Sequence, residues 1–139
     1  MKKSLIMVSR GFPQGSGLSP LLFNIFVRNL PRQCTSPIFQ FADDTTLVTE
    51  DPSLSVVAEK LTAAFDDVKQ FCDAHDLKIN LEKTRLILFK KLGKPMPDDF
   101  HLILDNYTVT LQKTVKLTGV TLDQHFTFGL HIDNVANKC

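Results

Sequence analysis

The sequence predicts an α+β fold in which antiparallel strands pack with helices. One observation is a long series of apolar residues spaced three and four apart, which predicts an amphipathic helix from Asp51-Pro52 to near His75. The other is a set of short β-rich segments, separated by turn residues, before and after that helix. The chain of 139 residues is therefore expected to form one domain or a piece of one, long enough to bury a core.

The N-terminal part of the chain predicts a strand, a glycine-rich turn and a helix. Residues 4–9 are mostly apolar and predict a short leading strand. Ser19 is a favourable N-cap and Pro20 sacrifices no hydrogen bond at the first helical position, so a helix is expected to begin there. Apolar residues from Leu21 to Leu30 lie on nearly every side of that helix, which predicts burial, and Pro31 is expected to end it.

Three β-rich segments flank the long helix. Ile38 to Thr49 predicts a tight β-hairpin with Asp43 and Asp44 at its turn. Beyond the helix, Leu77–Leu81 and Thr84–Phe89 are two further β-rich segments. The acidic residues on the outer face of the helix itself are expected to face solvent; they are Glu59, Asp66, Asp67 and Asp73.

The C-terminal third predicts a loop, a hairpin, a strand and a helix. Lys90 to Asp99 is polar and contains glycine and proline, which indicates a mobile loop. Leu102–Leu104 and Tyr107–Leu111 flank Asp105-Asn106, which predicts a hairpin with a two-residue turn. The remaining predicted elements are one strand and the beginning of a helix, at Val115–Leu122 and Thr127 to Lys138.

Net charge is only +1, but the charges are unevenly distributed. Residues 1–34 carry five cations and no acid, residues 43–76 carry nine acids against two lysines, and residues 78–94 carry six cations and one acid. A self-sufficient nucleic-acid binder usually has a stronger basic excess. The two basic stretches could contact phosphates while the acidic stretch holds metal, or all three could be solvated faces of mixed sign.

Composition and cysteine usage indicate an intracellular protein, in the nucleus or the cytoplasm. Every apolar run is shorter than the roughly 20 residues that cross a bilayer, so no membrane association is expected. The apolar stretch after Lys2-Lys3 is too short for a signal peptide, and Arg10 interrupts it. Cys34, Cys72 and Cys139 lack zinc-ligand spacing and are expected to be reduced thiols.

The candidate metal site is Phe41-Ala42-Asp43-Asp44. Phosphoryl transfer depends on metal ions about 3.5–4 Å apart that activate the attacking oxygen and neutralise the leaving one. Magnesium prefers carboxylate oxygens, and apolar strands on both sides would fix the turn that carries this pair. Adjacent strand residues point to opposite faces, so Asp43 is assigned as first ligand and Asp44 as second ligand or support. An isolated Asp-Asp pair is more often a turn or a helix cap; the flanking strands and the upstream segment favour metal here.

The upstream segment is Gly11-Phe12-Pro13-Gln14-Gly15-Ser16-Gly17. Pro13 keeps Phe12 extended, and the glycines let the backbone approach a ligand closely. Gln14 offers both a donor and an acceptor to a base or sugar edge. The segment therefore predicts a nucleotide-handling loop, and the alternative is a strand-to-helix turn that uses glycine and proline for geometry alone.

In this order and spacing the two segments resemble the reverse transcriptases of non-LTR (LINE-type) retrotransposons. Gly11 to Pro20 resembles the family's motif B, and Phe41 to Asp44 resembles its motif C. The helix from Asp51, followed by Leu77 to Thr84, resembles the motif D region. Leu117 to Val120 and His131-Ile132 resemble the primer-grip strand and its continuation towards the thumb.

The resemblance implies a polymerase palm-like antiparallel sheet with packed helices, in a magnesium-dependent RNA-directed DNA polymerase. It implies that Asp43 and Asp44 are catalytic metal ligands of a two-metal site. It also implies contact with an RNA template, a DNA primer and deoxynucleoside triphosphates. The residues implied to line the nucleotide and template site are Gln14, Gly15 and Ser16; those implied to lie near the incoming triphosphate are Asn80 and Lys83. Lys83 would assist the pyrophosphate leaving group, and the alternative for it is an ordinary surface lysine.

One family feature is not found in the sequence. The family's motif A supplies another catalytic aspartate upstream of motif B, but only ten residues precede Gly11 and none is acidic. Phe65-Asp66 follows motif C and belongs to the amphipathic helix, so it is no substitute. Residues 1–139 are therefore expected to be a partial, truncated domain without fingers and with little thumb: 1–10 form its leading strand, and 127–139 begin the thumb helix.

Three hypotheses follow. The first is a fragment of an RNA-directed DNA polymerase. It is expected to be inactive alone, because a missing ligand leaves the second metal poorly held. Upstream sequence or a partner chain that supplied the missing parts would change this expectation. The second is a catalytically dead, retrotransposon-derived remnant that acts as an RNA-binding or protein-interaction module. The third is a fragment that does not fold alone, because missing fingers and thumb would expose apolar surface.

Overall fold

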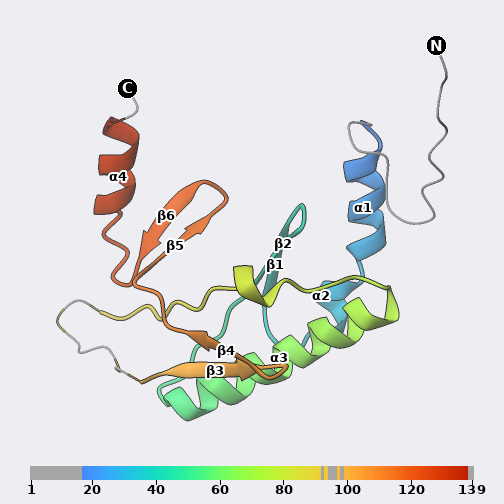
Figure 1. Cartoon of the computed structure of the whole chain (residues 1–139), viewed down its shortest axis with the longest axis horizontal. Coiled ribbons are helices and arrows are strands. Elements are labelled where there is room, and N and C mark those ends of the chain that lie inside the picture. Colours follow the sequence, from blue (N-terminus) through green and yellow to red (C-terminus); the bar gives the residue numbers. More distant parts are fainter. Residues whose placement is uncertain (1–16, 92, 94–96, 98, 138–139) are drawn as a thin grey trace.

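The structure is a computed structural model that describes residues 17–91, 93, 97 and 99–137 (Figure 1). Its strands form three separate two-stranded antiparallel sheets, so the predicted α+β class with antiparallel strands is confirmed for these residues. The predicted leading strand at residues 4–9 lies outside them. In chain order the elements are α1 (Ser19–Val27), α2 (Leu30–Gln33), β1 (Ile38–Phe41), β2 (Asp44–Leu47), α3 (Leu54–Ala74), the 3₁₀ helix η1 (Leu81–Lys83), β3 (His101–Leu104), β4 (Tyr107–Thr110), β5 (Thr114–Leu117), β6 (Val120–Asp123) and α4 (Gly129–Ala136).

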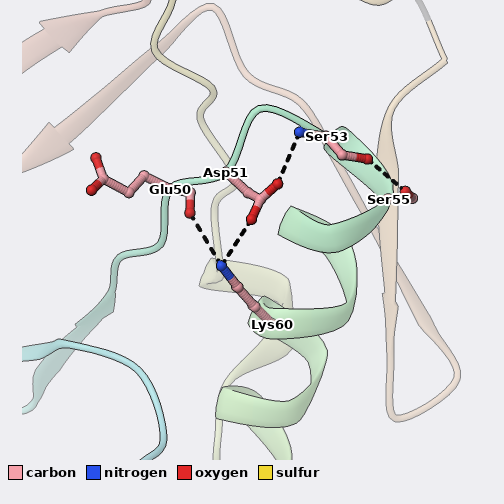
Figure 2. Close-up of polar contacts among 5 residues, drawn as sticks. All are labelled: Glu50, Asp51, Ser53, Ser55 and Lys60. Carbon is pink, nitrogen blue, oxygen red and sulfur yellow. Dashed lines mark hydrogen bonds and ion pairs between the residues drawn. The ribbon is translucent and has the colours of Figure 1, made fainter.

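Helix α3 is the longest element and confirms the predicted amphipathic helix. Its start is fixed by Asp51, whose carboxylate accepts the backbone N–H of Ser53 at 3.0 Å and pairs with Lys60 Nζ at 3.0 Å (Figure 2). Lys60 Nζ also donates to the Glu50 carbonyl at 3.4 Å. The Ser53 hydrogen bond, reinforced by Lys60, lowers the pKa of Asp51. These contacts fix the chain as it enters the helix from β2.

Two apolar clusters share α3 as their common wall. One joins Phe65 of α3 to the β3–β4 hairpin and to Leu86; its buried members are Phe65, Leu86, Leu102, Leu104 and Val109. The other joins α3 to α2; its buried members are Leu30, Val68, Phe71 and Cys72. Ile38 and Leu47, at the base of the β1–β2 hairpin, pack against this second cluster. The hairpin that carries the aspartates is thereby rooted on α3.

Helix α1 departs from the prediction in three ways. Leu18 is its N-cap, and Ser19 and Pro20 are its first two residues, so Ser19 does not cap it. The helix ends at Val27 with Arg28 as C-cap, before Pro31, which instead lies in the first turn of α2. The predicted burial was also wrong, because Val27 is the only buried residue of α1. Apolar residues all round a helix predict burial only where neighbours cover every face, and most of α1 has no such neighbour among the described residues.

The segment between α3 and β3 is not the pair of strands that was predicted. Leu86 makes a single parallel bridge with Leu111, supported by the hydrogen bond from the Gln112 N–H to the Leu86 carbonyl at 2.8 Å. The short helix η1 spans Leu81–Lys83, so it occupies the break between the two predicted segments and the last residue of the first. The segment is held by the burial of Leu86 and a few backbone bonds, so its β-rich composition produces no regular ladder.

The C-terminal part contains two hairpins, where one hairpin and one strand were predicted. The β3–β4 hairpin is confirmed, and its turn residues Asp105 and Asn106 have φ values of 50° and 62°, as a type I′ turn requires. The single strand predicted over 115–122 is wrong, since Thr118 and Gly119 form a turn between β5 and β6 with φ values of 46° and 92°. A β-branched residue rarely adopts positive φ, so Thr118 gave no turn signal. The predicted C-terminal helix is confirmed as α4.

Asp123, the last residue of β6, organises the passage into α4. Its carboxylate accepts backbone N–H groups from His125, Thr127 and Phe128 at 3.0, 3.1 and 2.8 Å. It also accepts the Thr127 hydroxyl at 2.9 Å. These hydrogen bonds, with that from the Thr127 N–H the largest, lower the pKa of Asp123 to about 2. The ionised carboxylate therefore fixes the chain between the two elements.

This network predicts a defined acid sensitivity. The Asp123 pKa is about 2 in the folded chain and about 3.9 when unfolded, so its contribution to stability is complete above about pH 5 and is lost as pH falls towards 2. In urea unfolding at pH 5.5 and pH 2.5, Asp123→Asn is expected to lose less stability on acidification than the wild type. Asp66→Asn, which removes an exposed carboxylate of α3, is the control and should follow the wild type. Equal losses in Asp123→Asn and wild type would contradict this assignment.

Among the residues that the structure describes, no helix is both long and apolar enough to span a membrane.

Candidate active site

The predicted β-hairpin is present and places its two aspartates at and beside the turn. In the register of β1 and β2, Ile38 pairs with Leu47 at the base and Phe41 pairs with Asp44 at the tip. Ala42 and Asp43 are the two turn residues between the strands. Asp43 therefore lies in the turn, whereas Asp44 is the first residue of β2, so only one of the two predicted turn aspartates is a turn residue.

The two faces of the hairpin have different surroundings. Directly paired residues of antiparallel strands lie on the same face, so Ile38 and Leu47 share the face that packs against the α3 cluster. Phe39 and Phe41 lie on the other face and are 63% and 66% exposed. Asp44, paired with Phe41, belongs to this outer face. The hairpin is thus fixed from one side, and it presents a carboxylate and two aromatic rings on the other.

Both carboxylates are exposed and have no hydrogen-bond or ion-pair partner among the described residues. Oxygen donors of this kind suit a hard cation such as magnesium, which keeps part of its water when bound to one or two carboxylates. Within the same residues, no group of three His, Cys, Asp or Glu side chains is placed to hold a metal. The two carboxylates at the hairpin are therefore of the ligand type that magnesium prefers, and they are two in number.

Ala42 holds the turn in a conformation that strains an alanine. Its φ is 51°, and it is the only one of the two turn residues with positive φ. This is the sign pattern of a type II′ turn, whose first central position favours glycine because a Cβ clashes there. The side chain that follows, Asp43, is directed by this strained turn.

Ala42→Gly is expected to stabilise the chain by up to about 1 kcal/mol, because glycine removes the strain of a left-handed residue and its own entropy cost is smaller. The measurement is the free energy of unfolding in urea. The matched control is Ala63→Gly at an exposed position inside α3, which should destabilise by about 0.5–1 kcal/mol. Destabilisation of similar size at both positions would contradict the turn geometry.

Asn80 and Lys83 occupy a single turn around η1. Asn80 is its N-cap and accepts the Lys83 backbone N–H on its side-chain oxygen at 3.2 Å. Its carbonyl also accepts the Thr84 hydroxyl at 3.0 Å. Both residues are exposed, and no hydrogen bond or ion pair joins them to Asp43 or Asp44. The remaining predicted site residues, Gln14, Gly15 and Ser16, lie outside the described residues.

Asp67 lies on the outer face of α3, as expected, and is partly exposed, but it also supports the candidate site. Its carboxylate accepts both the backbone N–H and the hydroxyl of Thr35, at 2.8 and 2.9 Å. Thr35 stands between α2 and β1, so this contact fixes where the hairpin leaves the α3 surface. The sequence could not show this contact, because helical periodicity identifies the outer face of α3 but not the loop that crosses it.

The model of the reverse transcriptase (RNA-dependent DNA polymerase) family matches residues 2–122, which is most of the chain and includes the hairpin. The chain belongs to the reverse transcriptase family. The resemblance inferred from the sequence is therefore confirmed at the level of the family.

Relatives of this reverse transcriptase chain come from mobile elements. It is 27% identical to the RNA-directed DNA polymerase from mobile element jockey of Drosophila melanogaster, across 96% of this chain and 15% of that protein. It is 28% identical to the probable RNA-directed DNA polymerase from transposon BS of the same species, across 93% of this chain and again 15% of that protein. The chain thus spans about 15% of the length of these relatives. No solved structure matches it.

Proposed function

We propose that this chain is the palm portion of a retrotransposon RNA-directed DNA polymerase. In this proposal, residues 1–139 form a partial domain that runs from the motif B-like segment to the start of the thumb, with 1–10 as leading strand and 127–139 beginning the thumb helix. The complete enzyme would add deoxynucleotides to a DNA primer on an RNA template. The observation that carries the proposal is the rooted β1–β2 hairpin, which presents Asp43 and Asp44 free of partners inside the segment that matches the family.

Each proposed site residue has a separate role. Asp43 and Asp44 would hold magnesium, which when bound activates the attacking hydroxyl and neutralises charge on the leaving phosphate. Gln14, Gly15 and Ser16 would line the nucleotide and template site, and Asn80 with Lys83 would lie near the triphosphate. The protein contributes position: packing of Ile38 and Leu47 on α3 would hold the two carboxylates in place without reorganisation during the reaction.

Two carboxylates do not complete a two-metal site. The described residues place no third ligand beside Asp43 and Asp44, so a further carboxylate would come from residues outside them or from another chain. We therefore expect the 139-residue chain alone to extend primers poorly or not at all.

Affinity cleavage tests the proposal without requiring turnover. Fe²⁺ replaces magnesium, and ascorbate with peroxide generates hydroxyl radicals in the presence of an RNA template annealed to a DNA primer. Cleavage is expected in the protein within a few residues of Asp43 and in the primer near its 3′ end, and excess magnesium should suppress both. Asp43→Ala/Asp44→Ala should abolish both cuts, whereas Glu59→Ala/Asp66→Ala, on the exposed face of α3, should retain them. Cleavage that is unchanged in the Asp43→Ala/Asp44→Ala variant would overturn the proposal.

A further inference from the structure

Three exposed phenylalanines gather beside the passage from β6 to α4. Phe89, Phe126 and Phe128, here called the aromatic platform, are 38%, 50% and 37% exposed. The rings of Phe89 and Phe126 are stacked, with centroids 4.0 Å apart and planes inclined by 20°. The rings of Phe126 and Phe128 lie 6.1 Å apart and are tilted by 45°. The platform therefore joins two segments distant in sequence, and its rings remain accessible to solvent.

The backbone under the platform is strained. Phe126 and Phe128 have φ values of 53° and 57°, in the left-handed region that bulky residues rarely adopt. Residues held in this way persist only when the surrounding structure determines them, and they concentrate at ligand sites. Phe126 and Phe128 are separated by one position and both adopt this conformation. Their rings are held at the surface by a backbone that is locally destabilised.

The platform is preorganised by hydrogen bonds from below. The Asp123 carboxylate accepts the N–H of Phe128 and the N–H and hydroxyl of Thr127, and the Asp123 carbonyl accepts the N–H of Phe126 at 3.1 Å. On the other side, the Lys90 N–H donates to the Gln124 carbonyl at 2.9 Å, and His125 Nδ1 donates to the Lys90 carbonyl at 2.9 Å. The two segments are fixed to each other, so little ordering entropy would be lost when a ligand binds.

Two lysines, Lys90 and Lys91, follow Phe89 directly in the chain and bring positive charge next to the platform. Between 78 and 91 the chain carries five cations and one acid, and this basic stretch ends at the platform with Lys90 and Lys91. Lys91 is exposed. The nearest acid along the chain, Asp123, is ionised, and its oxygens accept the hydrogen bonds that hold the loop. Exposed aromatic rings next to cations are the combination with which proteins bind single-stranded nucleic acid.

We propose that the aromatic platform binds an unpaired base of single-stranded nucleic acid by stacking, with the adjacent Lys91 contacting its phosphates. This contact goes beyond the proposed nucleotidyl transfer at Asp43 and Asp44 and needs no metal. Exposure of all three rings excludes a role in the core. The charge of the neighbouring segment favours nucleic acid over an apolar protein partner.

The test is the affinity of the full chain for a fluorescein-labelled, unstructured RNA 12-mer, measured by anisotropy in EDTA. Phe126→Asn removes the ring, but asparagine tolerates the left-handed backbone, so the loop should fold. Its affinity is expected to fall at least about fivefold, the effect of losing one base stack. On an oligomer with the same phosphates and abasic sugars, wild type and variant should bind equally. Phe89→Leu should weaken binding of the RNA in the same direction.

A control variant distinguishes base stacking on the platform from general aromatic contacts: Tyr107→Leu, an exposed aromatic of β4, should leave the affinity unchanged. Because binding is measured in EDTA, metal-dependent binding at the hairpin does not contribute, so failure of the proposed active site would be recognised separately. An unchanged RNA affinity in Phe126→Asn, or an equal loss on the abasic oligomer, would overturn the proposal. If Phe126→Asn instead converts a wild-type dimer into a monomer at unchanged RNA affinity, the platform is a contact between copies of the chain and the proposal is wrong.

Discussion

Phe71→Ala is expected to lower the free energy of unfolding by about 3–5 kcal/mol, which is a large part of the stability of a small domain. Phe71 is 2% exposed and belongs to the cluster that joins α3 to α2. Its ring also stacks on His75, with centroids 4.1 Å apart, and its carbonyl accepts the His75 ring nitrogen at 2.8 Å. Truncation would leave a cavity where α3 packs against α2. Urea unfolding measures the loss.

Phe39→Ala is the matched control, because the same atoms are removed from a ring that is 63% exposed on the outer face of β1. It should change the free energy of unfolding by about 0.5 kcal/mol or less. Since Ile38 and Leu47 pack on the Phe71 cluster, Phe71→Ala should also increase amide hydrogen exchange in the hairpin, whereas Phe39→Ala should not. Equal destabilisation by the two variants would contradict the assignment of the core to α3.

The second large effect is expected on metal affinity. Asp43→Asn should weaken Mn²⁺ binding at the hairpin at least about tenfold. Mutation of a residue that only hydrogen-bonds to a metal ligand already lowers metal affinity by about that factor, and Asp43 is proposed to bind the metal directly. Asp44→Asn should have a smaller effect, since Asp44 pairs with Phe41 on the outer face and is assigned as second ligand or support. Free Mn²⁺ measured by electron paramagnetic resonance gives both affinities. Glu59→Gln, on the exposed face of α3, should bind like the wild type; a larger effect at Asp44 than at Asp43 would reverse the assignment.

Elements whose cause is local could be predicted from the sequence. The period of α3 spans 21 residues, and the residues Asp105 and Asn106 tolerate the positive φ that the β3–β4 turn requires. The β5–β6 turn could not be found in this way, because Thr118 is among the residues least suited to its own conformation. Burial of α1 failed for a different reason: sequence periodicity gives the faces of a helix but not the neighbours that cover them.

The candidate site shows the same division. Asp43 and Asp44 could be proposed from sequence, because the pair lies between apolar strands and downstream of the segment that resembles motif B. The supports of the site depend on contacts between distant residues, such as Asp67 with Thr35, 32 positions apart. The aromatic platform depends on the pairing of Phe89 with Phe126 and on two left-handed residues, and neither follows from composition.

The central claim is that Asp43 and Asp44 form a metal site on a rooted hairpin. Its most direct test is paramagnetic broadening of backbone amide signals by substoichiometric Mn²⁺, compared between the wild type and Asp43→Asn/Asp44→Asn. We predict broadening centred on Phe41 to Thr45 that disappears in the variant and is reversed by excess magnesium. Broadening centred elsewhere, for example on the acidic outer face of α3, or persistence at the hairpin in the variant, would contradict the claim.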